Sequence, residues 1–236
     1  MANNAPTLAI IPARQGSKRL LGKNMLPLVG KPLIQWSIEA AQKSRAVDEV
    51  LVTSDDPSVL ALARQLGVDH VLERPRALAS DTAKTSDVIL HALEYRTRLD
   101  DSLGAICLLQ ATSPLRTAKD IDAAYDFYET RNALSVISVC ELEHPLAWCS
   151  TLDKNLFMKG FVDKICHDKR SQDHEKSYRL NGAVYIASAS FFMERGSFLT
   201  NETLAYVMPK SRSIDIDDEF DFRLTEAILK DREMQR

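Results

Sequence analysis

The sequence lacks the features that would place the protein in a membrane or outside the cell. It contains no apolar run of about 18 residues, the length that marks a candidate membrane-spanning helix. Its opening residues, MANNAPT, contain no basic charge and no long apolar stretch, so no signal peptide is predicted. We therefore expect a cytoplasmic protein without a membrane partner.

Paired cysteines are missing as well. None of the four cysteines forms a C-x-x-C pair: Cys107, Cys140, Cys149 and Cys166. His167 lies beside Cys166, but no second ligand pair follows at zinc-finger spacing, so a zinc site is not predicted. Cys107 and Cys140 lie within apolar runs, where buried free thiols are expected.

The chain also lacks a positive net charge, because 30 Lys and Arg residues are outnumbered by 33 Asp and Glu residues, a formal charge of −3. Nucleic-acid-binding proteins carry a basic footprint, so no nucleic-acid partner is predicted. The apolar share of 45% and the charged share of 27% are ordinary for a globular protein. We predict a single α/β domain over residues 1–236, with an insertion over 141–180.

What the sequence does contain is a basic loop near its start. The apolar run 8–11, LAII, predicts a buried strand, and glycines are interspersed in the loop that follows. The basic residues of this loop are Arg14, Lys18, Arg19, Lys23 and Lys31. A buried strand that leads into such a loop is how α/β proteins bind phosphates at the carboxyl end of a sheet. The alternative is a solvated basic loop without a ligand.

Neither of two common phosphate-binding motifs occurs in this loop. The P-loop needs G-x4-G-K-[ST], whereas five residues separate Gly16 from Gly22, and Asn24 follows Lys23. The dinucleotide fingerprint G-x-G-x-x-G is also absent from the stretch. Phosphate would therefore be held mainly by side chains.

Apolar runs alternate with amphipathic segments along the first 140 residues, which predicts βαβ units and a mostly parallel sheet. Strands are predicted at 8–12, 50–53, 68–72, 104–109 and 135–139, and helices at 32–43, 57–66, 87–98 and 118–128. The pattern breaks over 141–180, which predicts an inserted subdomain or a partner-binding arm. Beyond it, strands are predicted at 182–186 and 204–208, and helices at 189–195 and 218–232.

Near the end of the chain, residues 213–217, SIDID, alternate strictly between polar and apolar. If they are extended, the isoleucines face the core, and Asp215 and Asp217 share the other face with Cα atoms about 6.6 Å apart. Mg²⁺ commonly binds one or two carboxylates and fills its other positions with water and phosphate, so we predict a metal site. The alternative is a helix N-terminus whose acids complement the dipole, which we favour for Asp218 and Glu219.

Polar residues also follow the predicted strand 104–109. Gln110 ends this strand, at the position that faces the ligand crevice in open α/β sheets. The alternative is a turn in which Thr112 and Ser113 bond to their own backbone. We predict Arg116 to be a surface or helix-start residue, and the pair Asn-Gly at 181–182 to be a turn.

Several segments, in this order and spacing, resemble the acylneuraminate cytidylyltransferases, also called CMP-sialic acid synthetases. They are IPARQGSKR with GKN, ERPRALASDTA, LLQATSPLRT, RLNGAVYIA and SIDIDDEFD, which together span nearly the whole chain. The resemblance implies a Rossmann-like nucleotidyltransferase fold, with helices on both faces of the sheet and a small inserted dimerisation subdomain. It further implies that CMP is transferred from CTP to a nine-carbon 2-keto sugar acid by a Mg²⁺-dependent homodimer. Mn²⁺ is the alternative ion.

The same resemblance implies roles for individual residues, each carried over by matching motif. The triphosphate would be held by Arg14, Ser17, Lys18 and Lys23. The rest of the nucleotide would contact Asn24, Arg74 and Thr85. The sugar would bind Gln110, with Asn181 and Tyr185 nearby, and the metal would bind Asp215 and Asp217. The residues expected to act in catalysis are Arg14, Lys23, Asp215 and Asp217.

The identity of the sugar stays open at this point, because Ala111 stands where the family usually has proline. The alternatives are the cytidylyltransferases for pseudaminate, legionaminate and 3-deoxy-manno-octulosonate. The last of these tends to have S-T-R-L-P-G-K in the first loop, and GSKR with SIDID fits the nine-carbon family better. A different class is a non-catalytic nucleotide-binding regulator on the same fold. No histidine is placed as an obvious general base, so a metal-assisted or water-mediated deprotonation is expected.

Overall fold

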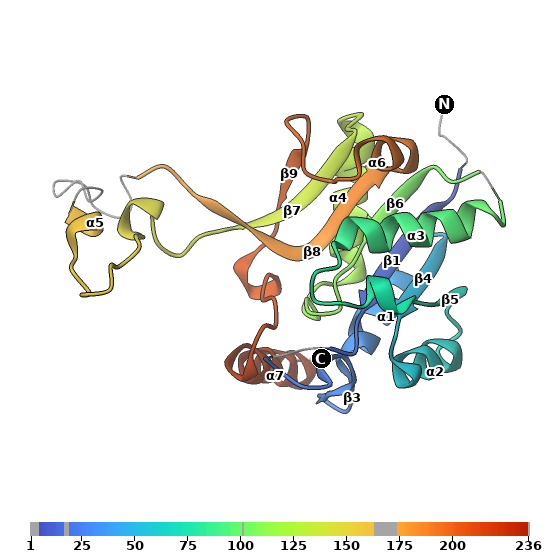
Figure 1. Cartoon of the computed structure of the whole chain (residues 1–236), viewed down its shortest axis with the longest axis horizontal. Coiled ribbons are helices and arrows are strands. Elements are labelled where there is room, and N and C mark those ends of the chain that lie inside the picture. Colours follow the sequence, from blue (N-terminus) through green and yellow to red (C-terminus); the bar gives the residue numbers. More distant parts are fainter. Residues whose placement is uncertain (1–4, 17–18, 101, 163–173, 236) are drawn as a thin grey trace.

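The computed structural model describes residues 5–16, 19–100, 102–162 and 174–235. Its sheet is built from β1 (Thr7–Ala13), β4 (Glu49–Ser54), β5 (His70–Glu73), β6 (Ala105–Leu108), β7 (Ser135–Glu141), β8 (Tyr178–Ser188) and β9 (Leu204–Val207). These strands form one seven-stranded sheet in the order β5-β4-β1-β6-β8-β7-β9 (Figure 1). A separate ribbon pairs β2 (Pro27–Leu28) with β3 (Lys31–Pro32).

The sheet is mostly parallel, as predicted. β1 pairs in parallel with β4 and β6, β4 with β5, and β7 with β9, whereas β8 runs antiparallel to both β6 and β7. The chain therefore leaves β1 toward one edge of the sheet and returns to β6 on its other side. In open α/β sheets, such a switch point opens a crevice beyond the carboxyl ends of the two strands.

Helices cover both faces of the sheet. The helices that do so are α1 (Leu33–Gln42), α2 (Pro57–Gln65), α3 (Thr85–Thr97), α4 (Ala118–Thr130) and α6 (Ala189–Arg195). Two further helices, α5 (Lys159–Val162) and α7 (Glu219–Met234), lie outside the cores on these two faces. Ala9 and Ile11 of β1 pack in one core with α1, α2 and α4, while Leu8 and Ile10 pack in a second core with α3 and α6. This split follows from the alternation of side chains along a strand.

Residues 142–162 and 174–177 are the described part of the predicted insertion that lies between β7 and β8, and residues 163–173 lie outside the described residues. Figure 1 shows this arm at the left, well away from the helices that cover the sheet. It contains a short 3₁₀ turn, Leu146–Trp148, and α5. No helix in the described part of the chain is both long and apolar enough to cross a membrane.

Two segments differ from the conformations considered for them. β8 begins at Tyr178, four residues before the predicted start, so Asn181 and Gly182 lie inside a strand rather than in a turn. Residues 213–217, for which an extended strand was one alternative, join no strand ladder. The segment is instead tied to the loop after β6, because the N–H of Ile216 donates to the carbonyl oxygen of Thr112 at 2.8 Å.

Candidate active site

A pocket of about 370 Å³ opens at the carboxyl ends of β1 and β6. The predicted site residues that line it are Arg14, Lys23, Asn24, Arg74, Thr85 and Gln110. They come from segments far apart in the sequence, and the switch point of the sheet brings them together. Ser17 and Lys18, predicted for the same loop, lie outside the described residues.

Arg14 directly follows β1 and stands at the wall of this pocket. Its Nη1 atom forms an ion pair with Oδ1 of Asp81 at 2.7 Å, and both side chains are roughly half exposed. Nδ2 of Asn24 donates to the carbonyl oxygen of Arg14 at 3.0 Å, which holds the two ends of the basic loop together. An anionic ligand in the pocket would therefore compete with Asp81 for the Arg14 guanidinium.

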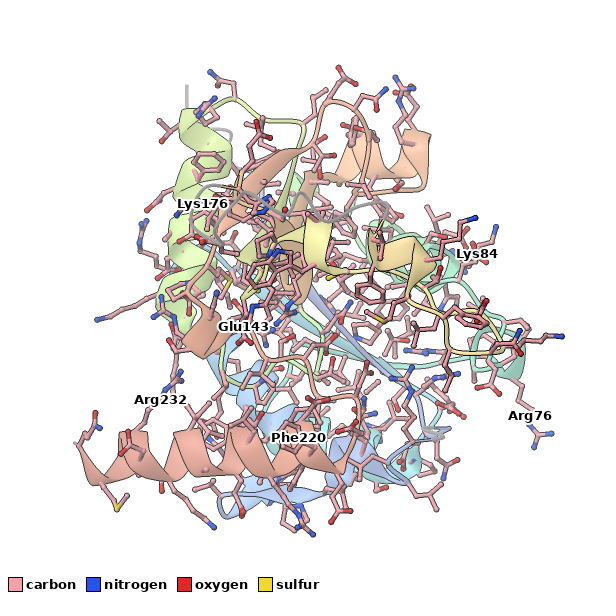
Figure 2. The ribbon with its side chains drawn as sticks, turned by 90° about the vertical axis from the view of Figure 1, so that its left-hand side faces the viewer. Arg76, Lys84, Glu143, Lys176, Phe220 and Arg232 are labelled. Atoms are coloured by element: carbon pink, nitrogen blue, oxygen red, sulfur yellow. The ribbon has the colours of Figure 1, made fainter. Side chains whose placement is uncertain are left out.

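Arg74 is a second cation of the pocket, and it is almost fully buried, with 6% of its surface exposed. Its Nη2 atom donates to the carbonyl oxygen of Thr53 at 2.9 Å, whereas its buried Nε has no hydrogen-bond partner. Burial lowers the pKa of Arg74, although the charge of Asp55 partly offsets this. Arg76 in the same loop points outward into solvent (Figure 2), so Arg74 is the arginine of this loop that lines the pocket.

Lys23 joins the pocket to the acidic segment 213–217. Its Nζ atom donates to the carbonyl oxygen of Ile216 at 2.6 Å. Burial lowers the pKa of Lys23, while the negative charges of Asp215 and Asp217 act in the opposite direction. Because Lys23 stands between the pocket and these two carboxylates, its charge can neutralise either an anionic ligand or the carboxylates.

The two aspartates of this segment have different surroundings. Oδ1 of Asp215 is buried and has no hydrogen-bond partner. Burial raises the pKa of Asp215, an effect that the Thr112 side chain partly offsets and the charge of Asp217 reinforces. Asp217 has 58% of its side chain exposed and forms an ion pair with Arg19 at 2.9 Å. Both carboxylates nevertheless lie near Lys23, since the charge of each acts on its pKa.

A second, smaller pocket of about 200 Å³ lies beside the first and shares Thr85 and Gln110 with it. Its apolar lining is Ile89, Leu108, Ile137, Leu180, Phe192, Phe198 and Leu199. Tyr185 of β8 also lines it, with its ring edge against Phe198. Burial raises the pKa of Tyr185, and the charge of Asp215 adds to the shift. Gln110 and Tyr185, both predicted for one ligand, thus border the same pocket.

Asn181, the third residue predicted to lie at the sugar, is fully buried and lines neither pocket. Its side chain is hydrogen-bonded to Ser138 and Ser213 instead. A direct contact with the sugar does not fit this position.

Two arginines near the site were not predicted from the sequence. Arg116 lies at a helix start, one of its two predicted positions, because it precedes Thr117, the N-cap of α4. It is not at the surface but only 2% exposed, and its Nη1 lies 3.2 Å from the carbonyl oxygen of Gln110 and 2.9 Å from that of Ala183. Burial lowers its pKa to about 10. Arg179 donates through Nη2 to the carbonyl oxygen of Ser213 at 2.9 Å. No local pattern marks either residue, since their partners are backbone oxygens of other segments.

The chain is similar to known proteins in both sequence and structure. A family model described as "Cytidylyltransferase" matches residues 8–158. N-acylneuraminate cytidylyltransferase of Escherichia coli O18:K1:H7 is 36% identical over 230 residues, 97% of this chain and 53% of that protein. CMP-N,N'-diacetyllegionaminic acid synthase of Legionella pneumophila is 35% identical over 227 residues, 94% of this chain and 96% of that protein. The chain thus spans about half the length of the first relative and nearly all of the second.

Two further matches agree with these. Pseudaminic acid cytidylyltransferase of Campylobacter jejuni is 31% identical over 223 residues, 94% of this chain and 96% of that protein. A solved structure of CMP:2-keto-3-deoxy-manno-octonic acid synthetase complexed with CTP has a TM-score of 0.72 and 17% identity. It covers 97% of this chain and 100% of the solved chain, a likeness in fold.

Proposed function

Because the chain belongs to the cytidylyltransferase family, we propose that it transfers the CMP group of CTP to a nonulosonic acid and releases pyrophosphate. The observation that carries the proposal is the pocket at the switch point, where Arg14, Lys23 and Arg74 meet beside a second, apolar pocket. The named relatives act on acylneuraminic, diacetyllegionaminic and pseudaminic acids, which supports a substrate of this class.

The cytoplasm remains the predicted location.

The first pocket would hold the nucleotide. Arg14 and Lys23 would neutralise the triphosphate, and charge that builds on the leaving pyrophosphate favours positive groups fixed in place before the reaction. Asn24, Arg74 and Thr85 would contact the remaining parts of CTP. Arg74 suits such a role, since its unpartnered buried Nε is a donor without an acceptor.

Mg²⁺ fits the acidic segment as a cofactor. Asp215 offers a buried carboxylate oxygen with no hydrogen-bond partner, and Asp217 follows two residues later. Within the described ranges, no three His, Cys, Asp or Glu side chains lie close enough to enclose a metal ion, so water and phosphate would complete the coordination. When bound, the ion would neutralise phosphate charge and acidify the attacking hydroxyl. Asp215 and Asp217 would hold it, and Mn²⁺ is the alternative ion.

The second pocket would hold part of the sugar acid. Most of its lining is apolar, and the polar side chains at its border are Thr85, Ser86, Gln110, Tyr185 and Ser197. Such a pocket suits an acyl substituent better than a hydroxylated chain, because a hydroxyl buried there would lose its hydrogen bonds to water. This favours an acylated nine-carbon acid over the eight-carbon octulosonate.

The proposed reaction is an in-line displacement at the α-phosphorus of CTP. The anomeric oxygen of the sugar acid forms the new bond, and the bond to the pyrophosphate oxygen breaks. No histidine lines either pocket among the described residues, so the proposal keeps a metal-assisted or water-mediated loss of the hydroxyl proton. The chain's own contribution is to position both substrates and to neutralise charge.

A homodimer through the arm is part of the proposal. The arm carries exposed apolar side chains at Leu146, Leu152, Leu156, Phe157, Met158 and Val162. Large exposed apolar side chains concentrated in one segment are typical of interaction surfaces, and a second copy of the chain is the partner that the family resemblance implies. The arm would then lie against the partner subunit.

The test is pyrophosphate release from CTP and Mg²⁺ by the purified full chain. N-acetylneuraminate, pseudaminate, legionaminate and the octulosonate are supplied separately. We expect release with an acylated nine-carbon acid and its loss on addition of EDTA. Binding of CTP without release in any of the reactions would contradict the proposal and support a nucleotide-binding regulator.

Gly182 allows a prediction about the sugar side of the site. It has φ 69°, and a Cβ at this position would lie 2.6 Å from Oε1 of Gln110. The substitution Gly182→Ala is expected to push the Gln110 amide away and raise KM for the sugar acid about tenfold, the loss of one hydrogen bond. KM for CTP should change much less.

The matched control is Gly67→Ala, because Gly67 also has φ 69° but nothing lies within 4 Å of the position that its Cβ would take. Both variants should lose about 1 kcal/mol of stability from the left-handed backbone. Equal KM values for the sugar acid in the two variants would show that Gly182 does not act through Gln110.

A further inference from the structure

A buried polar cluster, consisting of Ser138, Asn181 and Ser213, lies beneath the acidic segment. It forms at an irregularity between β7 and β8, where Ile137 pairs with Tyr185 but Val139 pairs with Leu180. Residues of β8 between these pairs therefore bulge out of the ladder opposite Ser138. Side chains replace the missing ladder bonds at this point, since the hydroxyl of Ser138 accepts from the N–H of Val184 at 2.8 Å.

The side chain of Asn181 is saturated with hydrogen-bond partners. Its Oδ1 accepts from Ser138 Oγ at 2.6 Å and from the N–H of Ala183 at 3.2 Å. Its Nδ2 donates to Ser213 Oγ at 2.9 Å and to Met208 Sδ at 3.5 Å. An amide has two donor hydrogens and two acceptor lone pairs, so no capacity is left for a substrate.

The cluster reaches the acidic segment through Ser213, two residues before Asp215. Ser213 is fully buried, and its hydroxyl also donates to the carbonyl oxygen of Pro209 at 2.8 Å. Residues 213–217 belong to no strand, so these bonds help to fix where the segment lies, together with the bond of Ile216 to Thr112 and those from Lys23 and Arg179. The position of the Asp215 carboxylate thus depends on a chain of contacts that begins in β7.

We propose that Asn181 is a positioning residue that holds Asp215 in place for the metal ion through Ser213, and that it does not contact the sugar. This inference rests on the proposed function. Its physical basis is that a fully satisfied buried network is rigid, whereas removal of one member leaves polar groups unpaired in a low dielectric. Rigid support of a ligand matters because loss of an outer partner typically weakens metal binding 10- to 100-fold, as a general order of magnitude.

The test measures Mn²⁺ binding directly, by electron paramagnetic resonance of the full chain with a non-hydrolysable CTP analogue. Ser213→Ala is expected to weaken Mn²⁺ binding by about tenfold or more. KM for the sugar acid at saturating Mn²⁺ should change less than about twofold. Ser138→Ala should weaken Mn²⁺ binding in the same direction, although Ser138 does not touch the acidic segment, because its effect must pass through Asn181.

Ser135→Ala is the matched control. Ser135 is also fully buried in β7, and its hydroxyl has two carbonyl oxygens within hydrogen-bond distance, those of Ile186 at 3.0 Å and Phe198 at 2.7 Å. It pairs with Ala187, at the end of β8 away from the cluster. This variant should lose similar stability in urea and keep the parent affinity for Mn²⁺.

Two outcomes would overturn the inference. One is an unchanged affinity for Mn²⁺ in both Ser213→Ala and Ser138→Ala, with or without a higher KM for the sugar acid. The other is a parent protein that binds no Mn²⁺ at all. A parent that binds Mn²⁺ but releases no pyrophosphate would instead contradict the proposed function, and the change in affinity would still decide the role of Asn181.

Discussion

Replacing Asp215 with asparagine is expected to lower turnover by at least about 100-fold without loss of stability. The neutral amide is a poor ligand for a divalent cation, and it removes a carboxylate whose buried Oδ1 has no hydrogen-bond partner. Because burial raises the pKa of Asp215, the charged form is disfavoured in the folded protein. Asp215→Asn should therefore leave the free energy of unfolding equal or slightly higher. Pyrophosphate release and urea unfolding measure the two effects.

The control for this variant is Asp231→Asn. Asp231 lies exposed near the end of α7, where its carboxylate accepts from the side chain of Gln235 at 2.7 Å. The same chemical change at that position should leave turnover within about twofold of the parent, as expected for a surface site away from the pockets. Turnover of Asp215→Asn within a factor of about ten of the parent would exclude Asp215 as a metal ligand.

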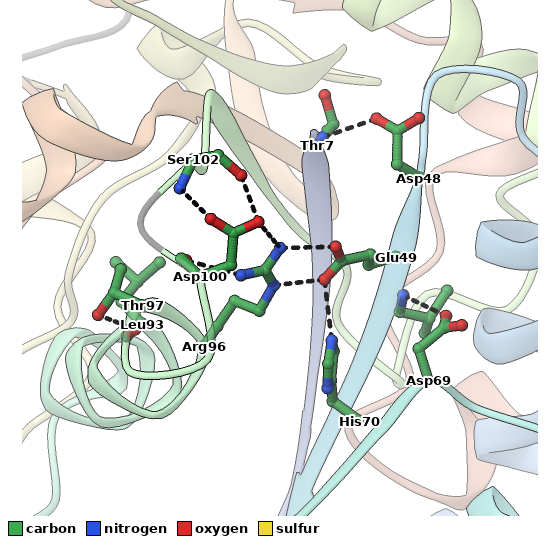
Figure 3. Close-up of polar contacts among 11 residues, drawn as sticks. Thr7, Asp48, Glu49, Asp69, His70, Leu93, Arg96, Thr97, Asp100 and Ser102 are labelled. Carbon is green, nitrogen blue, oxygen red and sulfur yellow. Dashed lines mark hydrogen bonds and ion pairs between the residues drawn. The ribbon is translucent and has the colours of Figure 1, made fainter. Parts of the chain in front are cut away.

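The second large effect, a loss of stability, is expected at Arg96. This residue contacts the amino end of β4, whereas the pocket lies at the carboxyl ends of the strands. Arg96→Met should lower the free energy of unfolding by about 3 kcal/mol, because it leaves the partly buried carboxylate of Glu49 without its arginine. The guanidinium is 4% exposed and binds Glu49 through two bonds, Nε to Oε2 at 2.5 Å and Nη2 to Oε1 at 2.7 Å. Figure 3 shows His70 on the same carboxylate, and Nη1 of Arg96 also donates to the carbonyl oxygen of Asp100 at 2.7 Å.

The geometry explains why this pair stabilises the fold. Glu49 begins β4, His70 begins β5 and Arg96 lies in the last turn of α3, so the cluster joins three elements at one end of the sheet. Its contacts are far from the substrate pockets. The folded Arg96→Met variant should therefore keep the turnover of the parent. Its lower free energy of unfolding should be seen in urea unfolding.

Arg98→Met provides the matched control, two residues further along the chain. Arg98 is 80% exposed and lies 4.0 Å from Glu94, which is 67% exposed. Such surface pairs contribute little, so this change should cost less than about 0.5 kcal/mol. An equal loss of stability in the two variants would show that the Arg96–Glu49 pair stabilises the fold no more than the exposed Arg98–Glu94 pair does.

The pH dependence gives an independent check on the same pair. Hydrogen bonding to Arg96 lowers the pKa of Glu49, with a further contribution from His70. A carboxylate with a lowered pKa in the folded state stabilises the protein above its unfolded pKa of about 4.3, and this stability is lost as pH falls through the folded value. The gap between the parent and Arg96→Met should therefore narrow below about pH 4. A constant gap would contradict the assignment.

Most helices and strands could be predicted from local sequence patterns. Leu8 and Ile10 face one core and Ala9 and Ile11 the other, as the alternation within a strand requires. Helix starts also have local signals, for example at Thr117, whose hydroxyl and Asp120 form a capping box. These features depend on residues within about four positions of each other, so the sequence alone contains the information.

Part of the site was also predictable. The basic loop after β1 and Gln110 after β6 meet at the pocket, because the carboxyl ends of parallel strands lie at one edge of the sheet. That residues 213–217 pair with no strand could not be predicted, because the alternation of polar and apolar residues does not show whether a second strand lies beside the segment. Burial of Arg116 was equally hidden, because it depends on the carbonyl oxygens of Gln110 and Ala183.

The sequence by itself determined the α/β class, the basic loop and the residue types available for a phosphate and metal site. Only the tertiary structure decided which of those residues are free to bind a ligand. Asn181 shows the difference, because its partners Ser138 and Ser213 lie 43 and 32 positions away in the sequence. Burial and hydrogen-bond saturation are set by such distant neighbours, so they arise only when the folded chain brings the segments together.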